Sequence, residues 1–301
     1  MKLRRRDFLY GVAGAPAMAG ALGAATIDVT SIKSRGTKKV EIVYKSPHAT
    51  PNGLQAGRDG LWVVDQGKEN WVSLINFADG KLIREFQIPG LAGASGFTVD
   101  PDGVIWINDT HNSLIVTCDS KDGKILGKYW CPGAGRPYQV PGDPPAARSP
   151  ILSPFPAPAP AAAAGGSGRA RGRGGIPGQL PMDATTGLSG EGGQGMEFRD
   201  GLLYYACLPS RRAYVLDPKT WSVHAMWNLP GNRAHGVGWE GETLWISDSN
   251  WRAFFRHDRT TGEIVEKIQL SEKDPLIHGV TVYDGYIWFS DDVGYICNLK
   301  L

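Results

Sequence analysis

The chain has 301 residues, of which 42% are hydrophobic and ten are Trp, which is ample for the packed core of one or two domains. Its formal net charge is +2, but Lys2 and Arg4–Arg6 against Asp7 place +3 of that in residues 1–25, so the rest of the chain carries about −1. This balance excludes a strongly basic nucleic-acid-binding protein, and we expect no nucleic-acid partner.

Residues 1–25 are predicted to be a twin-arginine signal peptide. Arg5 and Arg6 precede Phe8 and Leu9 in LRRRDFLYG, and the weakly apolar stretch 12–25 contains small residues suited to a signal peptidase. The stretch is shorter than the roughly 18–20 apolar residues that span a bilayer, so we expect no stable membrane span, with a short anchor as the alternative. The sequence therefore predicts export through the twin-arginine translocation machinery to a periplasmic or secreted location.

Residues 26–39 are polar and are predicted to be a linker, and 40–45 (VEIVYK) alternate as a strand does. This strand belongs to no complete repeat, and the last repeat ends after its third strand at YICNLKL. An open edge would expose unpaired backbone groups. We therefore predict that 40–45 pairs with 295–299 and closes the fold.

One unit recurs along the rest of the chain. Its clearest copies are RAHGVGWEGETLWISD and IHGVTVYDGYIWFSD, and weaker copies are NGLQAGRDGLWVVD, SGFTVDPDGVIWIND and QGMEFRDGLLYYAC. The repeat glycines are Gly53, Gly96, Gly195, Gly236 and Gly279, at spacings of 43, 99, 41 and 43 residues. Repeats of about 40–45 residues made of short strands predict an all-β fold, a β-propeller of four-stranded blades. We count five blades in a single domain over 40–301, with six as the alternative.

The spacing of 99 contains an insertion at 133–190. It includes PAPAPAAAAGG and GRARGRGG and has no periodic apolar segment. Such a segment buries too little surface to offset its chain entropy, so we predict a flexible low-complexity loop. A sixth blade within it is the alternative. Because it joins a fourth strand to a first strand, it emerges on the face where first strands begin, and there it has the position of a lid.

The same face is predicted to carry the functional site. The residues that precede the repeat glycines should surround the mouth of the central channel: Asn52, Ser95, Gln194, His235 and His278. Outside them lie the residues that end the second strands: Asp65, Asp109, Cys207, Asp248 and Asp291. Loops after the second strands add His111, Arg211, Trp251 and Arg252. Positions that carry the same residue in every repeat are expected to serve packing. A face on which the residues differ between repeats is expected to carry the site.

His235 and His278 lie in adjacent repeats and are candidates to bind one divalent metal, zinc or calcium, with Gln194 or Asn52 and a water. The metal would polarise a carbonyl or activate water, while a histidine or Asp248 moves the proton. The alternative is that the histidines only bond to loop backbone and the Asp residues accept backbone N–H groups.

A small-molecule substrate would use further residues of this face. Arg252 and Arg211 are candidates to clamp a carboxylate or phosphate, and Trp251 to stack on a ring. Asn52, Ser95 and His111 are further candidates to bind substrate. The alternative for the loop arginines is simple solvation.

The four cysteines, Cys118, Cys131, Cys207 and Cys297, have no metal-ligand spacing and are predicted to be mostly free.

The units HGVGW…LWISDSNWR and HGVTV…IWFSDD resemble NHL-type repeats and the related gluconolactonase-like (SMP-30) and virginiamycin B lyase-like propellers. The resemblance covers about 40–132 and 191–301 and implies the propeller fold, usually with six or seven blades. NHL-like amidating lyases hold zinc with histidines at the position before the glycine, which His235 and His278 match here; Asn52, Ser95 and Gln194 do not. Gluconolactonase-type sites use a Glu, Asn and Asp calcium set. Two hypotheses follow: a metal-assisted lyase or hydrolase acting on a small polar molecule at the channel mouth, or a non-catalytic ligand- or protein-binding propeller.

Overall fold

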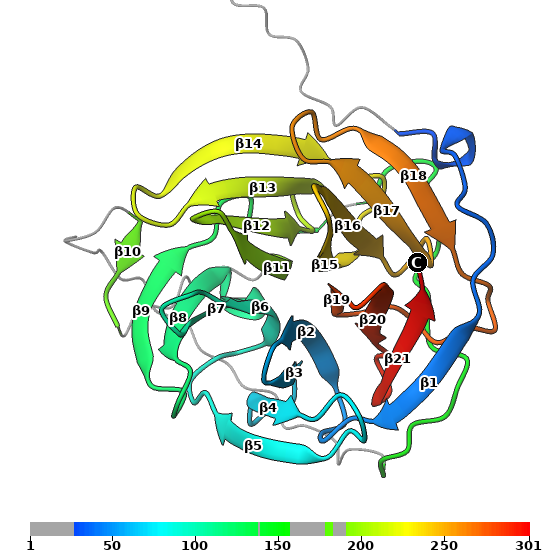
Figure 1. The fold of residues 1–301 in the computed structure, drawn as a ribbon. Coiled ribbons are helices and arrows are strands. Elements are labelled where there is room, and N and C mark those ends of the chain that lie inside the picture. Colours follow the sequence, from blue (N-terminus) through cyan, green and yellow to red (C-terminus); the bar gives the residue numbers. More distant parts are fainter. Residues whose placement is uncertain (1–26, 138, 157–177, 183–190) are drawn as a thin grey trace, which may run out of the picture.

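The computed structural model describes residues 27–137, 139–156, 178–182 and 191–301. The predicted signal peptide lies outside the described residues. The described chain is all-β and forms five antiparallel sheets arranged as the blades of a propeller (Figure 1). The predicted fold class and blade number are therefore confirmed, and no sixth blade occurs in the described ranges.

The blades are numbered in chain order, and each runs from an inner to an outer strand (Figure 1). Blade one contains β2 (Pro51–Gly57), β3 (Gly60–Asp65), β4 (Trp71–Ile75) and β5 (Leu82–Gln87). Blade two contains β6 (Ala94–Val99), β7 (Val104–Asp109), β8 (Leu114–Asp119) and β9 (Ile125–Trp130). Blade three contains β11 (Gly193–Arg199), β12 (Leu202–Cys207), β13 (Arg212–Asp217) and β14 (Ser222–Asn228). Blade four contains β15 (Ala234–Glu240), β16 (Thr243–Asp248), β17 (Ala253–Asp258) and β18 (Ile264–Gln269). Blade five contains β19 (Val280–Tyr283), β20 (Tyr286–Ser290), β21 (Tyr295–Lys300) and β1 (Val40–Lys45).

The core lies between the blades. The second strands are apolar on both faces because each is sandwiched between neighbouring blades, and every residue of β3 is buried. Trp62 of blade one, for example, belongs to one buried cluster with Phe97 and Ile107 of blade two. The outermost β5 instead alternates between exposed and half-buried residues.

The repeat glycines allow the inner strands to meet around the axis. A Cβ at Gly96 would lie 1.7 Å from the carbonyl oxygen of Gln194, and one at Gly195 would lie 2.3 Å from that of His235. The obstructing atoms belong to the backbone of the next blade, which cannot rotate away. Gly is therefore required here for close backbone approach, which explains why it recurs in every unit.

The ring is closed by the N-terminal strand, as predicted. Strand β1 pairs antiparallel with β21, from Val40 opposite Leu299 to Lys45 opposite Tyr295. The segment 27–39, predicted as a linker, contains the short 3-10 helix η1 (Val29–Ser31) and runs along blade four. Its Arg35 N–H donates to the carbonyl of Lys267 at 2.8 Å. The N-terminal segment thus joins blade four to blade five.

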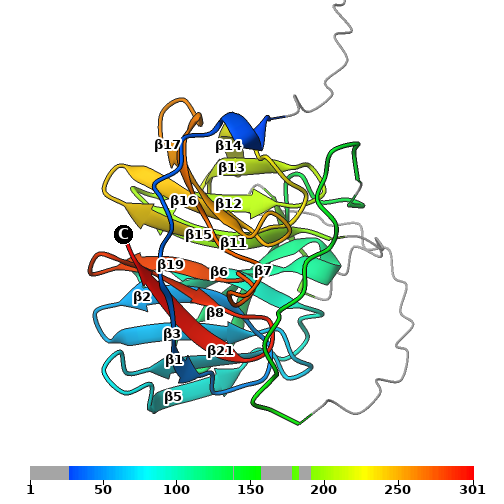
Figure 2. The same cartoon turned by 90° about the vertical axis from the view of Figure 1, so that its right-hand side faces the viewer.

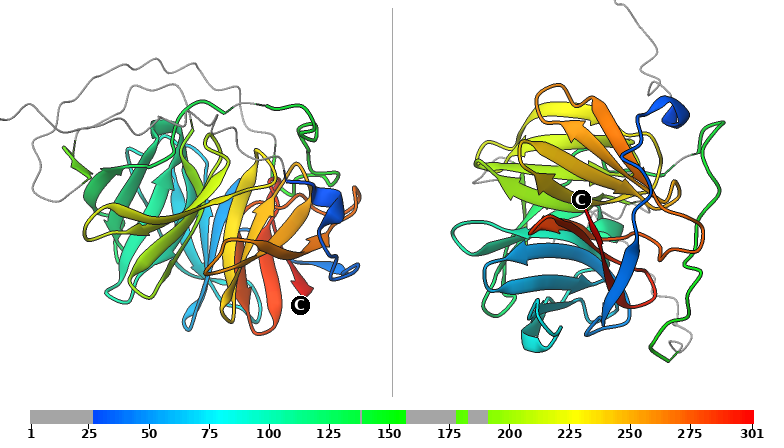
Figure 3. Two further views of the ribbon diagram at one scale, coloured as in Figure 1. Left: turned by 90° about the horizontal axis from the view of Figure 1, so that it is seen from above. Right: turned by 45° about the vertical axis from the view of Figure 1, so that its right-hand side comes forward.

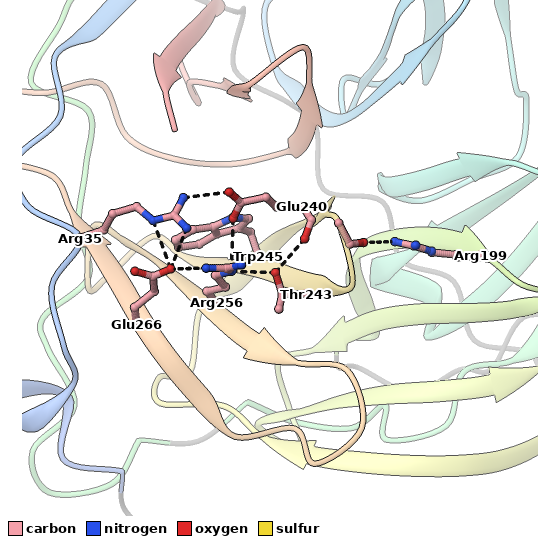
Figure 4. Close-up of polar contacts among 8 residues, drawn as sticks. Arg35, Arg199, Glu240, Thr243, Trp245, Arg256 and Glu266 are labelled. Carbon is pink, nitrogen blue, oxygen red and sulfur yellow. Dashed lines mark hydrogen bonds and ion pairs between the residues drawn. The ribbon is translucent and has the colours of Figure 1, made fainter.

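An ion-pair network reinforces this junction (Figure 4). Arg35 contacts Glu240 at 3.0 Å and Glu266 at 2.8 Å, and Arg256 contacts the same two carboxylates at 3.2 and 2.5 Å. The Arg35 guanidinium also lies 5.2 Å from the ring centroid of Trp245. Alternating charges in a shared network hold their geometry better than an isolated surface pair.

Parts of the insertion lie against the disc. Strand β10 (Gln179–Leu180) adds a fifth strand to blade two by pairing with β9. Residues 139–156, which we call the strap, cross one face of the disc as a green segment in Figure 2 and in the left view of Figure 3. The sequence predicted a flexible loop throughout 133–190; the described stretches make specific contacts with the blades.

Candidate functional site

The five residues before the repeat glycines form one ring where the inner strands meet, which we call the pre-glycine ring: Asn52, Ser95, Gln194, His235 and His278. All five are buried, with exposed fractions from 0% to 8%. They therefore do not line an open channel mouth as the sequence predicted. Their burial follows from the close approach of the inner strands beneath them.

The side chains of blades one to three in this ring bond to one another. Ser95 Oγ lies 3.2 Å from Asn52 Oδ1 and hydrogen-bonds to Gln194 Oε1. Asn52 Nδ2 donates to Gln66 Oε1 at 2.8 Å. We call Asn52, Ser95 and Gln194 the amide half of the ring.

The side chains of blades four and five form a histidine pair. The rings of His235 and His278 stack with centroids 4.3 Å apart and planes 10° apart. His235 Nδ1 lies 2.6 Å from Ser249 Oγ, and Ser249 donates its only hydroxyl proton to the carbonyl of Ile277. His235 must therefore carry its proton on Nδ1, which leaves Nε2 with a lone pair. Nε2 of His278 is buried and has no hydrogen-bond partner among the described residues.

Burial and a nearby positive charge keep both rings neutral. Burial, with a smaller contribution from the Arg233 guanidinium, lowers the pKa of His278 to about 3. Burial, His278 and Arg233 together hold the pKa of His235 well below its usual range. Arg233 Nη1 donates to the carbonyl of Ala147 in the strap at 2.9 Å. Sequence reasoning did not identify Arg233 as a site residue, although it directly precedes the Ala-His-Gly of the clearest repeat.

Asp292 is a second residue that the sequence did not single out. It follows His278 by 14 residues, the same separation by which Gln66 follows Asn52 and Ser249 follows His235. Burial and the neighbouring Asp291 raise the pKa of Asp292 to about 6, and Arg233 acts in the opposite direction. Its Oδ1 is buried and has no partner among the described residues. The signal for it was the doubled acid in IWFSDD.

The predicted outer ring of Asp residues holds loop backbone. Asp248 accepts the N–H groups of Arg233 and Trp251, each at 3.0 Å. Asp291 accepts the backbone N–H group of Leu276 at 2.6 Å. Asp65 and Asp109 make the same kind of contact with the loops that precede β2 and β6. Asp248 thus has the structural role that the sequence analysis kept as its alternative.

Most of the predicted substrate-binding loop residues lie outside the histidine pair and have internal partners. Arg211 makes two contacts of 2.7 Å with the carboxylate of Asp143 in the strap. Trp251 Nε1 donates to the carbonyl of Pro230 at 3.3 Å. His111, in the short 3-10 helix η2 (Thr110–Asn112), lies against Gly93.

The strap is bound to the same face beside the histidine pair. The N–H of Ala147 donates to Asn250 Oδ1 at 3.0 Å, and Arg252 Nη2 donates to the carbonyl of Arg148 at 2.6 Å. Ser149 Oγ donates to Asp291 Oδ2 at 2.8 Å. The strap therefore covers part of blades four and five, which is the position that the sequence predicted for a lid.

The predicted metal ligands do not fit one ion in this arrangement. An imidazole nitrogen binds a metal through a lone pair in the plane of its ring. Because the two ring planes are 10° apart and stacked, their lone pairs do not converge on a common point. Gln194 and Asn52 already have other partners, Ser95 and Gln66 respectively. No cluster of three or more His, Cys, Asp or Glu suited to a metal occurs in the described part of the chain.

Among the residues that the structure describes, none belongs to a helix long and apolar enough to cross a membrane.

Comparisons with known proteins establish the fold. No family model matches the chain, and no curated protein matches it. Glutaminyl cyclase from Myxococcus xanthus is similar in structure, with a TM-score of 0.55 and 9% identity over 88% of this chain and 97% of that one. A streptogramin B lyase has a TM-score of 0.47 and 18% identity over 88% of this chain and 98% of that one. Virginiamycin B lyase from Staphylococcus aureus has a TM-score of 0.45 and 17% identity over 85% of this chain and 67% of that one. At 9% identity, the similarity to the glutaminyl cyclase shows the fold alone, and membership in the NHL or gluconolactonase-like families stays a prediction.

Proposed function

We propose that this protein is an exported propeller enzyme, a lyase or hydrolase that acts on a small polar molecule at the histidine pair. The observation that carries the proposal is that His278 Nε2 and Asp292 Oδ1 are both buried and unpartnered among the described residues, and that the charge of Arg233 acts on both groups. Leaving a buried polar atom without a partner costs about 1–3 kcal/mol. A ligand group that bonds to either atom recovers this cost.

Proton transfer is the chemistry that these groups support. His235 presents a lone pair on Nε2, and His278 is neutral. An anionic substrate group beside Arg233 would offset the guanidinium charge and raise the pKa of His278, which makes it a stronger base. Asp292, with a pKa of about 6, exchanges a proton near neutral pH and suits the role of acid. Two groups whose environments separate their pKa values are typical of acid–base catalysis.

The divalent metal, zinc or calcium, stays a prediction. Its binding by His235 and His278 together requires at least one ring to rotate out of the stack. Elemental analysis of the purified protein beside His235→Ala and His278→Ala decides it. Metal that is present in the wild type and lost in both variants supports the site, whereas metal retained in both variants places it elsewhere.

The proposed activity is tested by incubating the protein with small lactones and small hydroxy acids and following ring opening or elimination by proton NMR. We expect His278→Leu and Asp292→Asn to lower turnover at least about 100-fold. His257→Leu is the matched control, because His257 is also buried with an unpartnered Nε2 but lies in β17. Turnover that is absent in the wild type, or unchanged in the two site variants, contradicts the proposal.

The strap favours the second hypothesis, a non-catalytic binding propeller. Asn250, Arg233 and Arg252 bond to backbone groups of Ala147 and Arg148, so the face already holds an extended segment of chain. Binding of the same small molecules without turnover, measured by a shift of the melting temperature, would support this alternative.

A further inference from the structure

One blade departs from the arrangement that anchors the loops on the site face. In blades one, two, four and five an Asp at the end of the second strand accepts N–H groups from the loop leading into that blade. In blade three the position is Cys207, and the incoming connection is the long insertion. A thiol is a poor acceptor for backbone N–H groups, so this blade needs another kind of anchor.

Cys207 has a second thiol beside it. Cys131, just past the end of β9, lies near Cys207, and its thiol donates to the carbonyl of Pro132 at 3.7 Å. The N–H of Gly193 donates to Cys131 Sγ at 3.3 Å, and Gly193 itself is the ladder partner of Cys207. Both cysteines belong to one buried cluster with Tyr205 and are fully buried. The two cysteines thus lie in one part of the core, where the chain leaves blade two for the insertion.

We propose that Cys131 and Cys207 are a disulfide-forming pair that closes the root of the insertion covalently, where the other blades use an Asp. Both thiols lose their protons, one S–S bond forms, and the two electrons pass to the disulfide of a thiol–disulfide oxidoreductase, which becomes a dithiol. Cys118 and Cys297 lie in two other core clusters and have no such neighbour there. The structure itself holds all four cysteines as thiols.

Burial determines when the bond can form. The neighbouring Cys207 thiol and burial together raise the pKa of the Cys131 thiol well above its usual range, and the thiolate is the reactive form. Oxidation therefore proceeds while the chain folds or opens locally, and the finished bond resists reduction in the folded protein.

The test refolds the full chain in a series of reduced and oxidised glutathione mixtures, alkylates the free thiols and maps the peptides by mass spectrometry. We expect a Cys131–Cys207 disulfide with Cys118 and Cys297 alkylated. Reduction should lower the melting temperature of this species by about 5–10 °C. Cys131→Ala should lose that dependence on reductant, and Cys118→Ala, the matched control, should keep it.

Four alkylated cysteines across the whole glutathione series, or a different pairing, would overturn the proposal. The peptide map is read on the wild type, so the result does not depend on whether Cys131→Ala folds.

Discussion

The two parts of the pre-glycine ring occupy equivalent positions in the repeats and rest on the same ring of glycines, but their polar groups are satisfied differently. In the amide half, Ser95 donates its hydroxyl proton to Gln194 Oε1, and Asn52 Nδ2 donates to Gln66. In the histidine pair, His235 has a partner in Ser249 whereas His278 Nε2 has none among the described residues. Arg233 lies on this second side, where it and Asn250 bond to the strap.

The difference separates structural roles from functional ones within a single ring. Hydrogen-bond partners are present for the ring residues of blades one to three, and the same fold could provide them in blades four and five. A buried polar group that is left without a partner lowers the stability of the folded protein, which is typical of a functional site. Substitutions in the amide half should therefore lower stability, whereas substitutions in the histidine pair should lower activity. Four measurements test this distinction.

The largest effect is expected at the glycines that support both parts. In Gly96→Ala the added Cβ would lie 1.7 Å from the Gln194 carbonyl oxygen, so the inner strands must separate. We expect little or no folded protein by circular dichroism and thermal melting. Gly135→Ala is the control, because the nearest atom to its Cβ is 3.8 Å away. A folded Gly96→Ala with an unchanged melting temperature would contradict the close packing.

The anchor of the strap should have the next largest effect. Asp143 and Arg211 are both about 5% exposed, and Asp143→Asn leaves a buried guanidinium without its carboxylate, which costs about 3 kcal/mol. Urea unfolding measures this loss, and proteolysis within 139–156 should become faster. Asp79→Asn, which breaks an exposed pair with Lys81, should change stability by less than about 0.5 kcal/mol. Equal effects would show that the strap is not anchored by this pair.

Matched substitutions in the two parts of the ring compare them directly. Gln194→Leu removes a partner of Ser95 and should destabilise the protein by about 1.5 kcal/mol. His278→Leu removes a polar atom that has no partner, and should be neutral or stabilising by up to about 1 kcal/mol. Both values come from urea unfolding at pH 7. The reverse order would show that His278 is the structural member of the ring.

The last effect is a dependence on pH. The pKa of His278 is lowered to about 3 in the folded protein from 6.5, so between these values the unfolded chain binds a proton that the folded chain does not. Stability should fall as the pH decreases below about 6.5, and this one residue contributes up to about 1.4 kcal/mol per pH unit. His278→Leu should show a shallower slope between pH 6.5 and 5. Identical slopes would mean that His278 is protonated in the folded protein.

Repetition and hydrophobic pattern determined the fold from the sequence alone. The recurring glycines predicted five blades, and the truncated last repeat predicted that Val40–Lys45 completes blade five beside Tyr295. These inferences succeed because a blade cannot bury its faces alone and a sheet edge must be paired, requirements that each repeat carries in its own residues.

The polar groups of the site were decided only by the tertiary structure. The sequence identified His235 and His278, but nothing in it showed that their rings stack rather than converge, that Ser249 fixes the proton of His235, or that Arg233 acts on the pKa of both His278 and Asp292. Each of these depends on distances between side chains from different strands and loops. Burial and hydrogen bonding then set the charge of every group, and neither is encoded in the spacing of residues along the chain.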